Sequence, residues 1–279
     1  MKATRRPATR VDVVTYDGTT RATRHDEVVT EEPLQIRAQG PGQPLRDVAV
    51  TMRTPGNDFE LAVGFLAGEG LLTSGEDLRE VRYCDVDPGE PQLYNVLTVA
   101  LSTPLPERAF ASRSVVGASC GTCGKTSIED VRVLTSPVPA TRPIPISTLV
   151  ELPAQLRGTQ SVFDRTGGLH AAGHARADGT IVTVREDVGR HNAVDKVVGA
   201  SLLTGPPVEP GDVLVLSGRV SFEMVQKAVL ARFGVIVAVS APTSLAVSAA
   251  DELGVTILGF TRNQQANVYS HMERVTFDA

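Results

Sequence analysis

The sequence contains no tryptophan, and aromatic residues make up only 4% of its 279 positions. Proteins that bind single-stranded nucleic acid stack bases on exposed aromatic rings, so this composition argues against that role. No apolar run approaches the roughly 18 residues that a membrane-spanning helix needs. The formal net charge of −5 gives no overall field that would attract nucleic acid or an anionic membrane. We therefore expect a globular protein that binds neither.

Cysteine is also scarce, with only Cys84, Cys120 and Cys123 in the chain. Three is an odd number and too few for a secreted disulfide scaffold. A reducing compartment, the cytoplasm, is therefore expected, where thiols serve chemistry or metal binding. Cys84 stands in a strand-like run and is interpreted as a buried, inert thiol. The first 24 residues are basic but lack the apolar stretch of a secretory signal, and we expect them to form a short mobile arm.

Short β-rich runs separated by turn residues characterise the first half of the chain. The expected strands are residues 11–15, 34–37, 48–53, 81–86 and 96–101. Asn57, with Glu60 three residues later, is the expected cap of one amphipathic helix. Residues 112–125 are rich in Gly and Ser and are expected to form a mobile loop. These features predict an N-terminal α+β subdomain over residues 1–140 that includes this loop.

The second half of the chain has a different pattern, in which strands without polar alternation are separated by helices. The expected strands are 180–185, 213–216, 235–239 and 255–258, and the expected helices are 192–203, 221–233 and 244–253. This order predicts an α/β subdomain over residues 141–279, with a largely parallel sheet that helices cover on both faces. Ligands bind such sheets at the carboxyl ends of the strands, so the strand-to-helix turns are the candidate sites.

The pair Cys120-Gly-Thr-Cys123 leaves several interpretations open. A zinc site would need two more ligands, but no second CxxC exists and the nearest histidines, His170 and His174, stand far along the chain. A redox dithiol normally lies at a strand-to-helix junction that lowers the thiol pKa, whereas a glycine-rich loop surrounds this pair. Carriage of sulfane sulfur needs a nucleophilic thiol on a loop that visits two partners, and Lys125 would favour the thiolate. Two incidental thiols are the fourth interpretation.

Ionisable residues gather beside glycines and short polar residues near the ends of the predicted strands. These segments are 163–174, 185–196, 217–219, 241–244 and 259–269. Helix N-termini attract phosphate, and Arg adds bidentate recognition of anions. A salt-bridged structural corner is the alternative for segments 163–174 and 185–196, and helix capping by itself explains the turns at 217–219 and 241–244. Their coincidence at one sheet edge predicts a site for a phosphate-rich ligand. The last segment would either recognise a purine through its amides, Arg and aromatic ring, or begin a polar helix.

Taken together, these motifs resemble the formate dehydrogenase accessory sulfurtransferase family, FdhD. The resemblance rests on Ser119-Cys-Gly-Thr-Cys-Gly-Lys125, Thr166-Gly-Gly-Leu-His170, Glu186-Asp-Val-Gly-Arg-His-Asn-Ala-Val-Asp-Lys196, Ser217-Gly-Arg219, Ala241-Pro-Thr-Ser244, Gly259-Phe-Thr-Arg262 and Asn267-Val-Tyr269. Their order and spacing cover about residues 50–270, and the combination is specific to the family.

The resemblance implies a sulfurtransferase with a persulfide intermediate. A cysteine desulfurase would load sulfur onto Cys120, with Cys123 as its helper. The protein would bind the molybdenum (or tungsten) bis-guanine-dinucleotide pterin cofactor and help install its sulfido ligand before the cofactor enters formate dehydrogenase. A guanine nucleotide is also expected to occupy the cofactor site. The family's cofactor segment corresponds to Phe260, Thr261, Arg262, Asn263, Gln264 and Gln265.

The resemblance further implies a homodimer, and a larger half with a cytidine-deaminase-like mixed sheet covered by helices. Deaminase zinc chemistry does not carry over, because its signature needs H-x-E and P-C-x-x-C. Here Ser119 precedes the CxxC pair, and neither His170 nor His174 is followed two residues later by Glu. No metal ligands are therefore assigned. The alternative function is a non-catalytic cofactor chaperone whose CxxC cysteines hold a structural metal.

Overall fold

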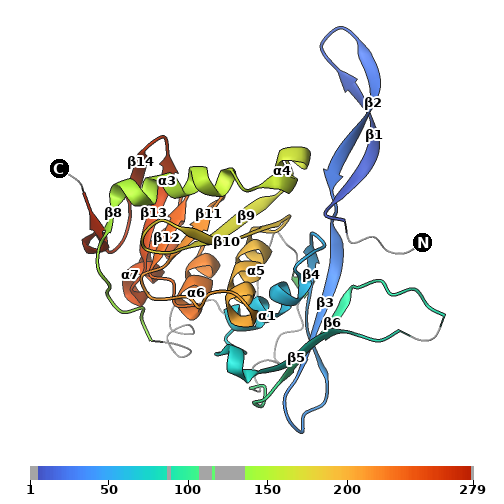
Figure 1. The fold of residues 1–279 in the computed structure, drawn as a ribbon, viewed down its shortest axis with the longest axis horizontal. Helices are drawn as coiled ribbons and strands as arrows, with labels where there is room; N and C mark the ends of the chain where they lie inside the picture. The colour runs from blue at the N-terminus through green and yellow to red at the C-terminus, as the bar shows by residue number, and fades with distance from the viewer. Residues whose placement is uncertain (1–5, 87–88, 107–114, 117–135, 278–279) are drawn as a thin grey trace.

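The computed structural model describes residues 6–86, 89–106, 115–116 and 136–277. The described residues form an α/β body on two large sheets, from which a long β-hairpin projects (Figure 1). The α/β class predicted from the sequence is therefore confirmed, whereas the cytidine-deaminase likeness and the division at residue 140 stay predictions. Cys120, Cys123 and the loop predicted around them lie outside the described residues. No helix in the described ranges is long and apolar enough to span a membrane.

The first half of the chain contributes the hairpin, a five-stranded sheet and one α-helix. Its elements are β1 (Ala8–Tyr16), β2 (Arg21–Val29), β3 (Glu32–Gln39), β4 (Arg46–Arg53), α1 (Asp58–Gly68), η1 (Gly75–Asp77), β5 (Leu78–Tyr83), β6 (Val96–Leu101) and β7 (Val115–Val116). The sheet has the order β5-β6-β3-β4-β7. Ile36 of β3 and Val99 of β6 pack with Leu61 and Leu66 of α1 in one apolar cluster. The strands expected within β3, β4 and β6 are confirmed.

Two predictions in this half need correction. Asn57 takes the N-cap position of α1, but its backbone is left-handed (φ 57°) and its side chain makes no capping hydrogen bond. β5 begins three residues earlier than expected and ends at Tyr83, which leaves Cys84 just beyond the strand. Cys84 is therefore half-buried rather than buried, and its Sγ lies 3.3 Å from Oγ1 of Thr98.

The second half of the chain builds a six-stranded sheet with helices on both faces. Its elements are β8 (Ile144–Pro145), α3 (Ile146–Arg157), α4 (Ser161–Thr166), β9 (His170–Ala175), β10 (Ile181–Asp187), α5 (Arg190–Leu203), β11 (Val213–Leu216), α6 (Phe222–Leu230), β12 (Val235–Ala238), α7 (Ser244–Leu253), β13 (Thr256–Arg262), β14 (Gln265–Val268), η3 (Met272–Arg274) and β15 (Val275–Thr276). Val213 and Val215 of β11 pack toward α3, whereas Leu214 and Leu216 pack toward α5, α6 and α7. The prediction that helices cover both faces of this sheet is confirmed.

The order of this sheet is β10-β9-β11-β12-β13-β14. Only β11, β12 and β13 are parallel, because β9 and β10 form an antiparallel pair and β14 folds back on β13. The expectation of a largely parallel sheet is therefore wrong, and the mixed sheet implied by the family resemblance is what the structure has. β9 reads HAAGHA and lacks the β-branched residues that mark a strand in sequence. Its strand conformation comes from burial between β10 and β11.

Helices α1 and α5 join the two halves and cross at two glycines (Figure 1). A Cβ atom on Gly64 would lie 1.8 Å from the carbonyl oxygen of Asp195, and one on Gly199 would lie 1.8 Å from that of Glu60. No side chain larger than hydrogen fits at such a distance. The Glu60 carboxylate also accepts two hydrogen bonds from Arg185 of β10, at 2.5 and 2.7 Å. The two halves are therefore packed as one body.

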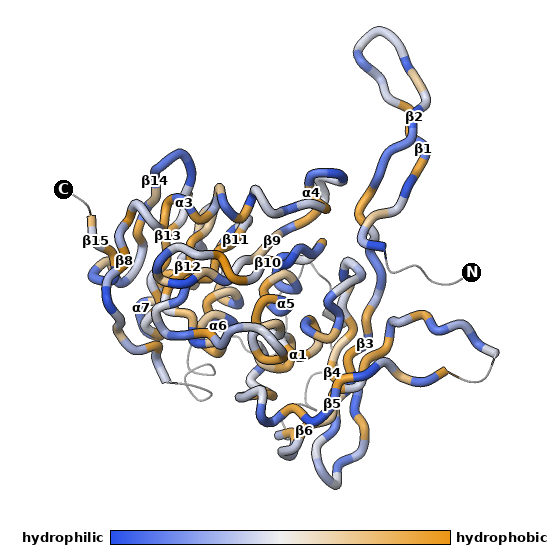
Figure 2. The backbone as a smooth tube through the Cα atoms, in the orientation of Figure 1, coloured by the Kyte–Doolittle hydropathy of each residue, from blue (hydrophilic) through white to orange (hydrophobic). Residues whose placement is uncertain are grey.

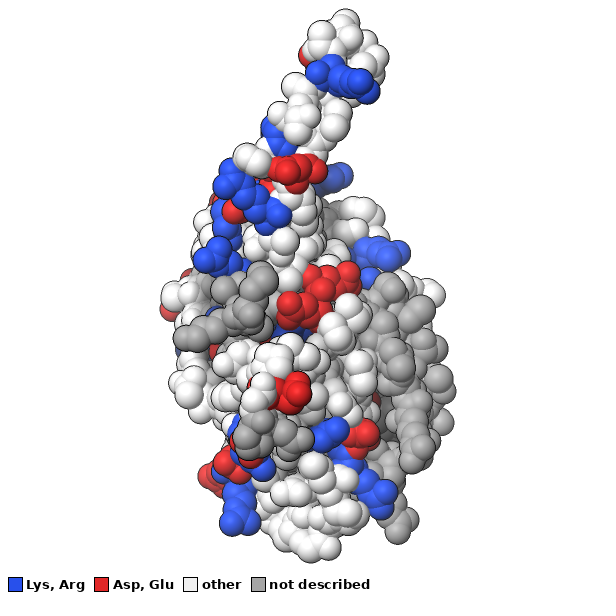
Figure 3. Space-filling view, turned by 90° about the vertical axis from the view of Figure 1, so that its right-hand side faces the viewer, with Lys and Arg blue, Asp and Glu red and all other residues white. Residues whose placement is uncertain are grey.

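The basic segment at the start of the chain is ordered, which corrects the expected mobile arm for residues 6–24. β1 and β2 pair over nine residues each in an unbroken antiparallel register. β2 reads RATRHDEVV, and its many charges hide the alternation that would mark a strand. Figure 2 shows hydrophobic colour concentrated in the body, with hydrophilic stretches along the hairpin. Pairing between the two strands, which project from the body (Figure 3), satisfies the backbone groups that face each other, without an apolar core.

Candidate functional site

An open cavity of about 660 Å³ lies where the three parallel strands of the large sheet end. Ser217, Val239 and Arg262 stand at the ends of β11, β12 and β13, and His170 begins the neighbouring antiparallel strand β9. Open α/β sheets bind ligands at this edge. The volume falls within the roughly 300–1,000 Å³ of small-molecule sites. The cavity therefore lies where the strand-to-helix turns led us to expect a ligand.

Three of the six residues predicted to contact the cofactor, Thr261, Arg262 and Asn263, line this cavity. Thr261 is fully buried, and its hydroxyl has no hydrogen-bond partner among the described residues. Buried polar groups are nearly always paired, so an unpaired hydroxyl facing a cavity indicates a group supplied by a ligand. The guanidinium of Arg262 adds a bidentate donor for phosphate or for a purine edge.

The remaining residues of this segment form a strained turn, and the helix start considered as the alternative is wrong. Arg262 pairs with Gln265 across the end of the β13–β14 hairpin. Asn263 and Gln264 between them have φ values of 52° and 61°, and Phe260 has a φ of 52° with a 42% exposed side chain. The left-handed backbone conformation is unfavourable for residues other than glycine. Residues held in such strained conformations are often found at ligand-binding sites. Phe260, Gln264 and Gln265 are not among the residues that line the cavity.

One wall of the cavity comes from α3 and α4, which the sequence analysis did not identify. Val150, Pro153 and Arg157 of α3 and Phe163 of α4 line it. The Arg157 guanidinium lies 4.8 Å from the centre of the Phe163 ring and also pairs with Asp164 at 2.6 Å. Pro145 and Pro153 hide this helix in the sequence, although Leu149, Leu152 and Leu156 are buried at helical spacing. The helical spacing of these leucines is the sequence feature that could have identified α3.

His170 lines the cavity, and the charges of neighbouring side chains affect its pKa. Burial lowers the pKa of His170, and the nearby charges of Arg190 and His191 lower it further. His191 in turn lowers the pKa of Glu223 to about 2, with its Nε2 4.0 Å from the Glu223 carboxylate. His170 is therefore neutral at pH 7 and offers one donor and one acceptor to the cavity.

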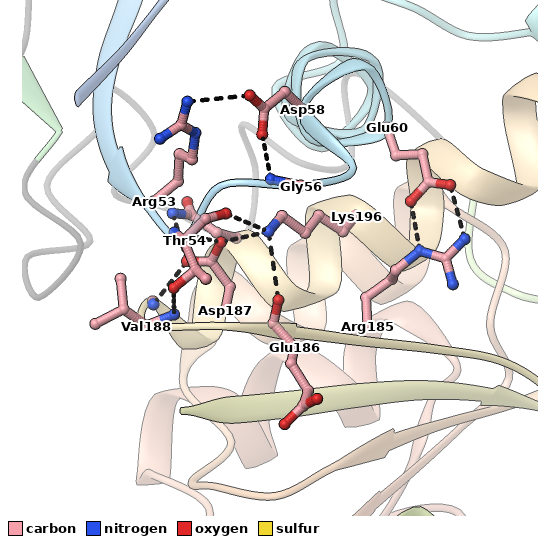
Figure 4. A network of polar contacts seen from close by, with 12 residues as sticks. Arg53, Thr54, Gly56, Asp58, Glu60, Arg185, Glu186, Asp187, Val188 and Lys196 are labelled. Carbon is pink, nitrogen blue, oxygen red and sulfur yellow. Dashed lines mark hydrogen bonds and ion pairs between the residues drawn. The ribbon is translucent and has the colours of Figure 1, made fainter. Parts of the chain in front are cut away.

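Most of the predicted phosphate-favouring cluster at 185–196 is instead a structural network between the two halves (Figure 4). The buried carboxylate of Asp187 accepts from the N–H groups of Thr54 and Gly189 and lies 2.7 Å from Nζ of Lys196. Lys196 also donates to the carbonyl oxygen of Thr54 at 2.9 Å. Only Val188 of this segment lines the cavity. The salt-bridged corner is therefore the correct interpretation for these residues.

The two remaining turns also act mainly within the fold. Thr243 caps α7 by accepting the N–H of Ala246 at 3.3 Å, so capping explains residues 241–244. Ser221 holds the predicted N-cap position of α6 without a side-chain capping bond. Ser217 lines the cavity, and its hydroxyl accepts the N–H of Ala171 at 2.9 Å. The ligand edge is therefore narrower than the sequence suggested, and the parts of the predicted turns that line the cavity are residues 167–170, Val188, Ser217 and residues 261–263.

Comparison with known proteins gives the family. The FdhD/NarQ family matches residues 29–276, which is nearly the whole chain. The chain belongs to the FdhD/NarQ family. A sulfur carrier protein FdhD from Mycolicibacterium paratuberculosis is 49% identical over 258 residues, which covers 90% of this chain and 93% of that protein. A sulfur carrier protein FdhD from Streptomyces coelicolor is 47% identical over 266 residues and covers 92% of each chain.

A solved structure supports the fold of this family member. The crystal structure of a formate dehydrogenase accessory protein from Desulfotalea psychrophila superposes with a TM-score of 0.73 at 22% identity. The match covers 97% of this chain and all of that chain. The FdhD/NarQ match begins at residue 29, where the β1–β2 hairpin ends, and includes every residue that lines the cavity. The cavity therefore lies within the part of the chain that defines the family.

Proposed function

We propose that this FdhD/NarQ protein carries sulfur as a persulfide on Cys120 and transfers it to the molybdenum (or tungsten) bis-guanine-dinucleotide pterin cofactor. The donor is a cysteine desulfurase in the cytoplasm, and the sulfurated cofactor passes to formate dehydrogenase. The names of the relatives support sulfur carriage. For the cofactor, the supporting observation is the cavity in which the unpaired Thr261 hydroxyl lies beside Arg262.

The proposed transfer has two covalent steps. The Cys120 thiolate attacks the outer sulfur of the donor persulfide, and the donor cysteine leaves as a thiolate. Cys123 then attacks Sγ of Cys120, so a Cys120–Cys123 disulfide forms and the outer sulfur leaves as hydrosulfide with the bonding electrons. Hydrosulfide and a solvent proton replace an oxygen ligand of the metal, which leaves as water. A cellular dithiol then reduces the disulfide.

The cavity suits one guanine-nucleotide arm of this substrate. Its wall of Val150, Pro153 and Leu169 offers apolar contact for a ring, and Arg262 and Asn263 supply donors for phosphate and purine edges. A volume of about 660 Å³ is that of a site for a single small molecule. The remainder of the cofactor would extend through the open side of the cavity.

A short series of contacts connects the described chain on the N-terminal side of the cysteines to the wall of the cavity. Val116 of β7 pairs with Thr51 of β4, whose hydroxyl lies 3.2 Å from Oδ1 of Asn192 near the start of α5. Asn192 also bonds to Asp187, one residue before Val188 of the cavity wall. An extended chain covers about 3.6 Å per residue, so a thiol four residues past Val116 is tethered within about 15 Å of it. This tether supports delivery into the cavity.

Replacement of Cys120 by Ala is expected to abolish sulfur loading. After incubation with a cysteine desulfurase and cysteine, the intact mass of the wild-type chain should rise by about 32 Da, one sulfur atom, because only a thiolate accepts sulfane sulfur. Cys84→Ser is the matched control and should keep the increment, since Cys84 lies half-buried beside Thr98. Absence of the increment in the wild type, together with one zinc ion per chain, would replace this function by that of a metal-holding chaperone.

Replacement of Arg262 by Ala is expected to weaken binding of GDP, measured by calorimetry, by about 10- to 100-fold. A charge-assisted hydrogen bond contributes about 1.5–3 kcal/mol, and tenfold in affinity corresponds to about 1.4 kcal/mol. Arg79→Ala, an exposed arginine on β5 far along the chain from the cavity, should bind GDP like the wild type. Equal affinities for all three proteins would remove Arg262 from the cofactor site while leaving the Cys120 test unaffected.

A further inference from the structure

The cavity at the sheet edge extends from the end of β13 to the end of β10, with α3 lying along it (Figure 1). Arg262 lines it at the end of β13, and Val188 lines it one residue beyond β10. β12, β11 and β9 lie between these two strands. Neighbouring strands are about 4.8 Å apart, so the two ends of the cavity are separated by on the order of 15–20 Å. A single nucleotide can therefore place different groups at the two ends.

The two ends differ in charge. At the β13 end, Arg262 forms no ion pair with a described residue, and the buried hydroxyl of Thr261 has no hydrogen-bond partner among them. At the β10 end, the Arg157 guanidinium is already paired with the Asp164 carboxylate at 2.6 Å. The lowered pKa of His170 leaves its ring uncharged at pH 7. The β13 end therefore suits phosphate, and the β10 end suits an uncharged purine ring.

Gln160 lies between α3 and α4 and lines the cavity at the β10 end. Its backbone is fixed, because its N–H donates to the oxygen of Arg157 at 3.3 Å and its oxygen accepts the N–H of Asp164 at 3.0 Å. Only 4% of the residue is exposed, yet its side-chain amide forms no hydrogen bond with a described residue. An almost buried amide without a partner lowers stability, so it indicates a group that pairs with a ligand.

Helix capping does not occupy this amide. Gln160 holds the N-cap position of α4, where a side chain usually accepts the second or third N–H of the helix. These two N–H groups belong to Val162 and Phe163, and both donate instead to the carboxylate of Glu186 on β10, at 3.1 and 2.8 Å. The Gln160 side chain makes no capping bond. The amide is therefore available to a molecule in the cavity.

We propose that Gln160 binds the guanine base of the nucleotide arm through O6 and N1–H, while Arg262 binds its phosphates at the other end of the cavity. This inference rests on the proposed function, which supplies the guanine nucleotide. The amide has an acceptor, Oε1, and a donor, Nε2, which match the N1–H donor and the O6 acceptor of guanine. This edge of the purine lies opposite the ribose, so it faces Gln160 when the phosphates lie at Arg262.

Replacement of Gln160 by methionine, which has a similar shape and no amide, is expected to weaken GDP binding about 5- to 100-fold in calorimetry. The variant loses two hydrogen bonds between neutral groups, each of which contributes a factor of roughly 2 to 12 in affinity. Gln155→Met is the matched control, because Gln155 is exposed on α3 and is not among the residues that line the cavity. The control should bind GDP like the wild type.

Inorganic pyrophosphate separates the two ends of the site, because it has phosphates and no base. Titration with pyrophosphate should give the same affinity for the wild type and Gln160→Met, and a weaker affinity for Arg262→Ala. Urea unfolding without nucleotide tests for a structural role of the amide. Since the amide has no partner in the described fold, Gln160→Met should unfold at the same or a higher urea concentration than the wild type.

The proposal is overturned if Gln160→Met binds GDP like the wild type, if it loses GDP and pyrophosphate equally, or if it unfolds at a lower urea concentration. A wild type that binds GDP but not pyrophosphate would overturn the separate phosphate end. A wild type that does not bind GDP would overturn the proposed cofactor site as well. Normal GDP binding by Arg262→Ala, with weakened binding by Gln160→Met, would remove Arg262 and keep Gln160 as the base contact.

Discussion

Replacement of Gly199 by alanine is expected to destabilise the protein by at least about 3 kcal/mol, because the new methyl group overlaps a carbonyl oxygen that cannot move independently. The added Cβ would lie 1.8 Å from the oxygen of Glu60 in α1. Relief requires α1 and α5 to separate. Separation would strain the bonds of Asp187 to Thr54 and of Arg185 to Glu60, which hold the two halves together. Gly64→Ala should have a similar effect, since it meets Asp195 at the same distance.

Urea unfolding of the two variants measures this effect. Glycine inside a helix is about 1 kcal/mol less favourable than alanine, so in open space Gly199→Ala would stabilise α5. Gly158→Ala is the matched control, because Gly158 follows α3 in a right-handed conformation and its nearest neighbours lie 3.5 Å or more from the added atom. The control should change stability by less than about 1 kcal/mol. A Gly199→Ala protein as stable as the control would show that the two helices are not in close contact.

Replacement of Lys227 by methionine is expected to destabilise the protein by about 3–5 kcal/mol, because it leaves the buried carboxylate of Asp195 without its partner. The Lys227 Nζ lies 2.6 Å from Oδ1 of Asp195, and both side chains are almost completely buried. The ammonium group also lies 5.6 Å from the centre of the Phe65 ring, which adds a smaller attraction. This pair lies beside Gly68 of α1, so its loss also weakens the joint between the two halves.

A second substitution separates charge burial from packing. Asp195→Asn combined with Lys227→Met removes the uncompensated charge, and we expect it to recover much of the loss. Burial raises the pKa of Asp195. A raised pKa means that the folded state binds more protons, so stability is lost as the pH rises through that pKa. The deficit of the single variant should therefore be smaller at about pH 5 than at about pH 8. A deficit that is independent of pH and unchanged in the double variant would assign the effect to packing.

The family, the α/β class and most core elements could be predicted from the sequence. Helix 244–253 matches α7 completely, and the strands within β3, β4, β6 and β11 were recovered. These segments have strong local signals, because a buried strand needs β-branched residues and a buried helix face needs apolar spacing. The cysteine pair, with its glycine-rich surroundings, was equally evident as a motif, although Cys120 and Cys123 lie outside the described residues.

Other features depend on contacts between distant segments, and the sequence alone did not determine them. Strand β9 has weak strand propensity and is held between β10 and β11, whereas the strand expected at 11–15 lies within β1 but its pairing with the charged β2 was not foreseen. The left-handed turn at Asn263 and Gln264 opposes local preference and is closed by the pairing of β13 with β14. The cluster at 185–196 contained the residue types of a phosphate site, but Thr54 and neighbouring groups of the first half occupy its donors and acceptors. Local sequence therefore determined the elements and the chemistry available. Only the tertiary structure decided which polar groups are paired internally and which, like Thr261, remain available to a ligand, because pairing depends on positions in space.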